Sequence, residues 1–135
     1  MADDVLLAKA ELMENCLRRI REVYADNPDH LFKDLTRQDS ILLNLERCCQ
    51  AAIDAALRIV KLRHLGLPKE SRDAFALMAN AGLLPDELAR SLQAMVGFRN
   101  VAIHNYRELD LQIVQSIITR EVDDFRRFIT LILAF

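Results

Sequence analysis

Residues 37–64, RQDSILLNLERCCQAAIDAALRIVKLRH, decide the fold, because they place apolar residues at helical spacing without an intervening glycine or proline. One face of an α-helix repeats every three to four residues, and the stretch follows that period. The positions that match are Ile41, Leu45, Cys48, Ala52, Ala55 or Ala56, Ile59 and Leu62. Further apolar residues lie outside this stripe, which is typical of a helix packed on two or more sides. We therefore expect a central helix, with Thr36 or Asp34 as its N-cap.

The rest of the chain predicts further helices separated by clear breaks. Before the central helix, a helix is expected over residues 4–24 with Asp3 or Asp4 as its cap, followed by a loop around Pro28. After it, the expected helices are a short one from a cap at residue 71 to about residue 81, one from about residue 85 onward, and one over residues 111–134 with Asp110 as its cap. The prediction is an all-α fold, an up-and-down bundle of four main helices plus one short helix, in a single domain of residues 1–135.

Composition supports this fold and limits the function classes. Of the 135 residues, 52 % are hydrophobic and 28 % charged, with 3 Gly and 3 Pro, too few breakers for a many-stranded β protein. No run approaches the roughly 18 apolar residues of a membrane span, and the N-terminus lacks the features of a signal peptide, so the cytoplasm is expected. The net charge of -2 argues against extensive coating by nucleic acid, but not against a small positive cleft.

The three cysteines predict buried thiols rather than a metal site. Cys48 and Cys49 are adjacent and Cys16 stands alone, so none has the short pairing that a zinc site needs. We expect no bound metal or cofactor, and we expect all three thiols to pack in or near the core.

The residues with the chemistry of a catalytic site gather in residues 97–106, GFRNVAIHNY. Arg99 offers a permanent charge and a planar fork of donors that suits phosphate. His104 has the one side chain whose ordinary pKa lets it exchange protons near neutrality. Together they are the minimum set for cleaving a phosphodiester without a metal. Taken alone, each residue also has a commoner structural role: ion pairing for Arg99, a helix end for His104, a C-cap for Asn100 and a core aromatic for Tyr106.

The spacing of the two residues constrains how they can share a site. On an unbroken helix, residues five apart differ by about 140° of rotation. Either the helix ends between Arg99 and His104, or a second chain supplies the missing group. We favour a site shared across a two-fold interface of a homodimer.

The motif of Arg99, Asn100, His104 and Tyr106 resembles the signature of the HEPN ribonuclease superfamily. More closely, the chain resembles the HepT toxins of HepT/MntA toxin–antitoxin pairs, because residues 38–51, 65–68 and 95–100 also match in order and spacing. The resemblance implies a metal-independent ribonuclease, in which the ribose 2′-hydroxyl attacks the adjacent phosphate and leaves a 2′,3′-cyclic phosphate. It implies that Arg99 holds the phosphate, that His104 is the general base or acid and that Asn100 orients groups by hydrogen bonds. It also implies a composite site at a dimer cleft.

The resemblance gives the remaining residues and partners their expected roles. Tyr106 is expected to receive AMP from a minimal nucleotidyltransferase antitoxin similar to MntA, which would place bulk and negative charge beside the site. Asp39 is a possible supporting residue that would pair with an arginine near the site. The alternative is a non-catalytic HEPN module that only binds a nucleotidyltransferase or nucleotide, and a second rival is a purely structural helical dimer.

Overall fold

The computed structural model describes residues 3–104 and 110–135, for residues 101–104 the backbone alone. In these ranges all regular secondary structure is helical, which confirms the all-α prediction. The elements are α1 (Asp4–Tyr24), α2 (Asp29–Phe32), α3 (Leu35–Leu62), α4 (Asp73–Asn80), α5 (Asp86–His104), α6 (Leu111–Ser116), the π-helical segment η2 (Ile117–Glu121) and α7 (Val122–Ile132). None of the described helices is long and apolar enough to cross a membrane.

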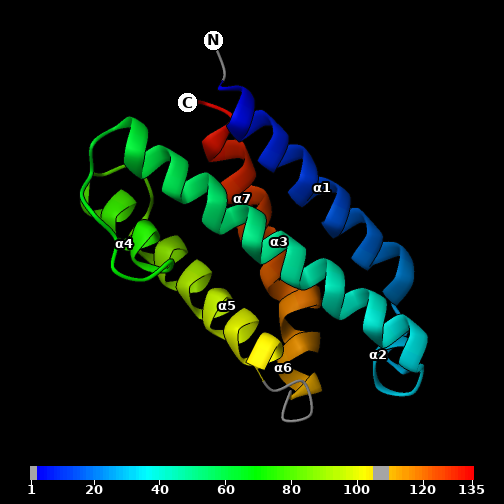
Figure 1. The fold of residues 1–135 in the computed structure, drawn as a ribbon. Coiled ribbons are helices and arrows are strands. Elements are labelled where there is room, and N and C mark those ends of the chain that lie inside the picture. Colours follow the sequence, from blue (N-terminus) through cyan, green and yellow to red (C-terminus); the bar gives the residue numbers. More distant parts are fainter. Residues whose placement is uncertain (1–2, 105–109) are drawn as a thin grey trace.

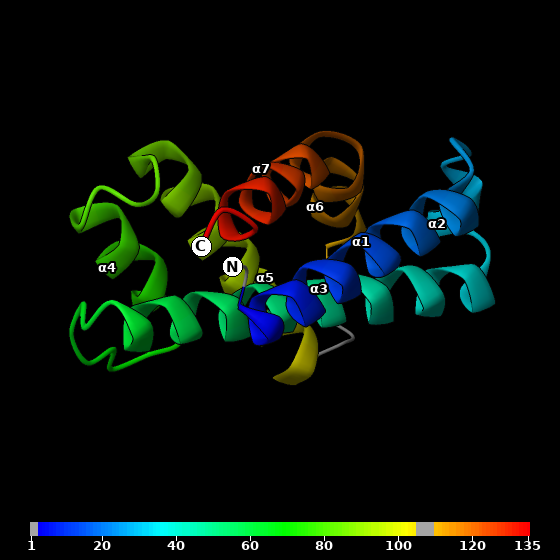
Figure 2. The same ribbon diagram turned by 90° about the horizontal axis from the view of Figure 1, so that it is seen from above.

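Helix α3 is the centre of the arrangement, as its apolar surface predicts. It lies beside the antiparallel helix α1 along much of its length and also contacts α2, α4, α5 and α7 (Figure 1). Helices α4 and α5 lie beside each other, and α7 packs between α5 and α1 (Figures 1 and 2). The N- and C-terminal ends of the described chain lie close to each other in both views.

Aspartates start three of these helices at predicted positions. Carboxylate oxygens accept hydrogen bonds from backbone N–H groups that a helix N-terminus otherwise leaves unpaired. Asp3 accepts from the N–H of residues 5 and 6 at 3.0 and 3.1 Å, Asp34 from that of residue 37 at 3.1 Å, and Asp110 from that of residue 112 at 2.8 Å. Asp3 also accepts a hydrogen bond from Arg58 on α3 at 2.9 Å, and this contact holds the pKa of Asp3 below its ordinary value of 3.8.

The structure corrects the prediction in three places. The loop around Pro28 contains the short helix α2, stabilised where Asn27 accepts from the N–H of Asp29 at 3.0 Å and where His30 Nδ1 bonds the carbonyl oxygen of Tyr24 at 2.8 Å. The short helix α4 begins at Asp73 rather than after residue 71, and the Asp73 carboxylate accepts from the N–H groups of residues 69 and 70. The last helix is interrupted by η2, a π-helical turn that contains no proline.

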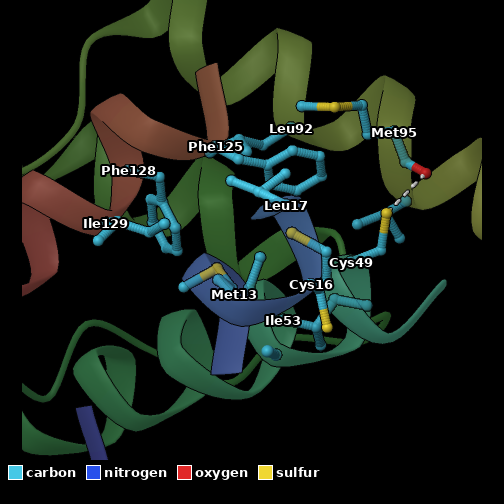
Figure 3. Packing of buried hydrophobic residues seen from close by; sticks show 14 of the residues in the cluster. Met13, Cys16, Leu17, Cys49, Ile53, Leu92, Met95, Phe125, Phe128 and Ile129 are labelled. Carbon is cyan, nitrogen blue, oxygen red and sulfur yellow. Dashed lines mark hydrogen bonds between the residues drawn. The ribbon is translucent and has the colours of Figure 1, made fainter. Parts of the chain in front are cut away.

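The core is a continuous cluster of apolar side chains from α1, α3, α4, α5 and the C-terminal helices. Phe75 of α4 and Phe128 of α7 meet edge to face, with ring centroids 5.7 Å apart and planes at 70°. Cys16, Cys48 and Cys49 are all free and buried, as predicted. Burial raises the pKa of each of these thiols above its ordinary value, so they remain neutral. Figure 3 shows Cys16 and Cys49 among the apolar side chains of this cluster.

Candidate active site

The candidate site lies where α5 crosses the middle of α3. At this crossing the Cys49 thiol donates to the carbonyl oxygen of Met95 at 3.7 Å (Figure 3). One turn later on α5, Arg99 reaches Gln50 on α3. Beyond the crossing, the C-terminal end of α5 extends past α3, as the yellow end of the helix shows in Figure 2. The motif is therefore carried on a helix end that projects from the bundle.

Arg99 is held from two directions. Its Nη2 donates to Gln50 Oε1 at 2.5 Å, and its Nη1 donates to Asn100 Oδ1 at 3.2 Å. Its Nε is buried and has no hydrogen-bond partner in the described part of the chain. Burial raises the pKa of the Cys49 thiol to about 12, and the nearby Arg99 charge opposes part of that increase. Arg99 is thus a half-buried cation with a fixed direction, beside a thiol that stays neutral.

A second layer of polar groups stands behind Arg99. Gln50 Nε2 donates to Asp54 Oδ1 at 2.9 Å, one turn further along α3. Asp54 Oδ2 in turn pairs with Lys9 Nζ of α1 at 3.1 Å. The order of the contacts is therefore Lys9, Asp54, Gln50, Arg99, and it links α5 through α3 to α1.

The backbone settles one of the alternatives left open by the sequence. Helix α5 continues to His104, so the expectation that the helix might end between Arg99 and His104 is wrong. The two residues are about 140° apart around one helix axis, given its 3.6-residue period. Asn100 is exposed inside the helix, so its possible role as a C-cap is also wrong.

Of the two other predicted site residues, Asp39 and Tyr106, the structure describes only Asp39. Asp39 is exposed in the second turn of α3. It lies on nearly the same face of α3 as Gln50, about 16 Å along the helix axis by the 1.5 Å rise per residue. Its pairing with an arginine stays a prediction. Tyr106 lies outside the described residues. In the part of the chain that the structure describes, no group of three or more His, Cys, Asp or Glu side chains could hold a metal ion.

Comparison with known proteins identifies the class to which this fold and site belong. The sequence model of the family described as "Ribonuclease HepT-like" matches residues 13–132, so the chain belongs to the HepT-like ribonuclease family. The expected HEPN resemblance is thereby confirmed. The chain is 42 % identical to the mRNA nuclease HepT of Shewanella oneidensis over 132 residues, which cover 98 % of both chains.

Solved structures agree with the family and the fold. A tri-AMPylated Shewanella oneidensis HEPN toxin in complex with an MNT antitoxin superposes with a TM-score of 0.93 at 41 % identity, covering 98 % of this chain and 99 % of that one. A toxin–antitoxin structure with AMP-PNP superposes with a TM-score of 0.94, also at 41 % identity, covering 98 % of this chain and 100 % of that one. The helical bundle expected from the sequence is therefore the fold of HEPN toxins.

Sequence reasoning missed the polar groups behind Arg99. Gln50, Asp54 and Lys9 come from two helices, and no periodicity predicts which polar residues of neighbouring helices will meet. One signal was present: Gln50 and Asp54 are polar residues four apart within the otherwise apolar stretch of residues 48–57, so they share one side of the central helix.

Proposed function

We propose that this chain is the toxin of a toxin–antitoxin pair and acts in the cytoplasm as a metal-independent endoribonuclease on RNA. The observation that carries the proposal is the fixed Arg99 guanidinium at the base of the projecting end of α5, five residues before His104. The name of the Shewanella relative, an mRNA nuclease, agrees with this chemistry.

The proposed reaction uses an arginine and a histidine in place of a metal ion. His104 takes the proton of the ribose 2′-hydroxyl, whose oxygen attacks the adjacent phosphorus and displaces the 5′-oxygen of the next nucleotide. That oxygen receives a proton from a histidinium, and the products end in a 2′,3′-cyclic phosphate and a 5′-hydroxyl. Arg99 neutralises the charge that develops on the phosphate oxygens, and Asn100 orients groups by hydrogen bonds.

The proposed site is composite and includes residues from two copies of the chain. Because α5 is unbroken, the backbone positions of Arg99 and His104 in one copy are about 140° apart around the helix axis. A two-fold axis beside the projecting end of α5 would bring Arg99 of one copy toward His104 of the other, twice in each dimer. We propose Asp39 as a supporting residue on the side of α3 that also carries Gln50.

The first test is cleavage of RNA by the purified chain in the presence of EDTA, with mapping of the product ends. We expect cleavage that the chelator leaves unchanged, 2′,3′-cyclic phosphate ends, and growth arrest when the chain is produced without its partner. Replacing His104 with Ala should abolish both effects while the variant stays folded and dimeric. Well-folded wild-type chain that neither cleaves RNA nor arrests growth would support the alternative, a non-catalytic HEPN module that binds a nucleotidyltransferase or nucleotide.

We propose that the partner is a minimal nucleotidyltransferase antitoxin similar to MntA, which transfers AMP to Tyr106. A related HEPN toxin has been solved in tri-AMPylated form in complex with an MNT antitoxin. The transfer joins the tyrosine oxygen to the α-phosphorus of ATP, with release of the phenolic proton and pyrophosphate. An adenylate two residues from His104 adds bulk and negative charge, which would repel an RNA backbone.

The two tyrosines of the chain provide a matched test of this modification. We expect radiolabel from α-labelled ATP to be incorporated by the antitoxin into the wild type and into Tyr24→Phe, but not into Tyr106→Phe. Tyr24 is a suitable control because it is buried and its hydroxyl already meets Gln115 at 3.3 Å. Label retained in Tyr106→Phe would contradict the assignment.

A further inference from the structure

We infer that Gln50 is a positioning residue for the phosphate-binding arginine, and that Asp54 and Lys9 fix the direction of its amide. The inference rests on the proposed function, since it assigns a role to groups that act through Arg99. The structural basis is the continuous order of contacts from Lys9 of α1 through Asp54 and Gln50 of α3 to Arg99 of α5.

The chemistry of the neighbours determines the orientation of the Gln50 amide. Asp54 is a carboxylate that only accepts hydrogen bonds, so the Gln50 NH2 group must face it. Arg99 only donates, so the Gln50 oxygen must face Arg99. Lys9 holds the second oxygen of Asp54 and keeps that carboxylate in place. The amide therefore has one satisfactory orientation, and in it an acceptor always faces the guanidinium.

A neutral acceptor suits this position better than a carboxylate would. Gln50 directs Arg99 through one of its five N–H donors and leaves the whole positive charge available to a phosphate. A carboxylate at residue 50 would bind Arg99 more strongly and offset its charge before substrate arrives. It would also face the Asp54 carboxylate, and two like charges at hydrogen-bond distance are unfavourable.

The contacts among α1, α3 and α5 also account for the direction of the Arg99 side chain. The Arg99 side chain extends from α5 at the base of its projecting end, and its hydrogen bond to α3 anchors it to the bundle. Gln50 provides that contact from the centre of α3, and Asp54 ties it to α1. Loss of the contact should misplace the guanidinium in the transition state while substrate binding through other groups continues.

The experiment compares Gln50→Glu and Gln50→Met with Gln93→Glu on RNA cleavage. Gln93 lies on α5, its amide donates to the carbonyl oxygen of Arg72 at 3.2 Å, and it undergoes the same chemical change at a site that does not contact Arg99. We expect kcat to fall about 10- to 100-fold in Gln50→Glu, where the new charge offsets that of Arg99, and less in Gln50→Met, where the contact is lost. KM should change by no more than about twofold in Gln50→Met. Gln93→Glu should stay within about twofold of the wild type in both constants.

The outcomes separate this inference from the proposed function. Wild-type chain that cleaves no RNA overturns both. A cleaving wild type with Gln50→Met as active as Gln93→Glu overturns the positioning role alone, because Gln50→Met removes the contact to Arg99. If Gln50→Met fails to fold, Asp54→Asn decides, since its amide no longer forces the Gln50 orientation: a drop in kcat of about two- to fivefold supports the role, and unchanged kcat overturns it.

Discussion

Arg99→Ala and His104→Ala chains, each inactive alone, should recover about a quarter of the wild-type RNA cleavage when they are mixed and allowed to exchange subunits. In a two-fold dimer whose sites combine Arg99 of one copy with His104 of the other, half of the mixed dimers are heterodimers. Each heterodimer contains one site with both native residues and one site with neither. The unbroken path of α5 from Arg99 to His104 is the reason to expect this arrangement.

The measurement is initial cleavage rate after mixing at equal concentrations. Alone, Arg99→Ala should lower kcat by about 10²- to 10³-fold and His104→Ala by about 10²- to 10⁴-fold, the usual ranges for losing an anion-stabilising donor and a general acid–base group. The control mixes wild type with the double variant. It should retain about a quarter of the activity if sites are shared and about half if each site lies within one chain. No recovery in the first mixture, with half retained in the second, would contradict a composite site.

Phe128→Ala should be among the most destabilising substitutions in the part of the chain that the structure describes. The Phe128 side chain is fully buried and packs edge to face on Phe75, joining α7 to α4. Removing it loses apolar burial and leaves a cavity that the surrounding helices fill only in part. The expected cost is about 3–5 kcal/mol of unfolding free energy, which corresponds to a decrease in Tm of roughly 10 °C or more.

The measurement is chemical denaturation followed by circular dichroism, with Leu67→Ala as the control. Leu67 is 94 % exposed in the segment between α3 and α4, so its truncation should change stability by less than about 0.5 kcal/mol. Equal stability of the two variants would contradict the assignment of the Phe75–Phe128 contact to the core.

The helices could be predicted from the sequence because their signals are local. Asp3, Asp34 and Asp110 stand directly before apolar residues at helical spacing, and each accepts the backbone bonds of a cap. Gly82 follows α4 with φ of 75°, a conformation that glycine adopts without strain. The central position of α3 followed from apolar residues on more than one of its sides. These features depend on neighbours within a few residues in the sequence.

Features that depend on small insertions or distant neighbours could not be predicted in this way. Helix α2 has four residues, too few to show a helical period. The π-helical segment η2 does not interrupt the spacing of apolar residues in the last helix, so the sequence predicts one continuous helix there. In the candidate site, the chemistry of Arg99 was evident from its type, but its contact with Gln50 depends on how α5 crosses α3.

The three buried thiols can report how often the helical bundle opens in solution. An alkylating reagent attacks the thiolate, and Cys16, Cys48 and Cys49 are both shielded from solvent and held neutral by burial. Their labelling in native buffer must therefore wait for a transient separation of the helices, so its rate measures how often α1, α3 and α5 come apart. A binding partner that clamps these helices together will slow the labelling, and the effect can be followed by mass spectrometry on the unmodified sequence.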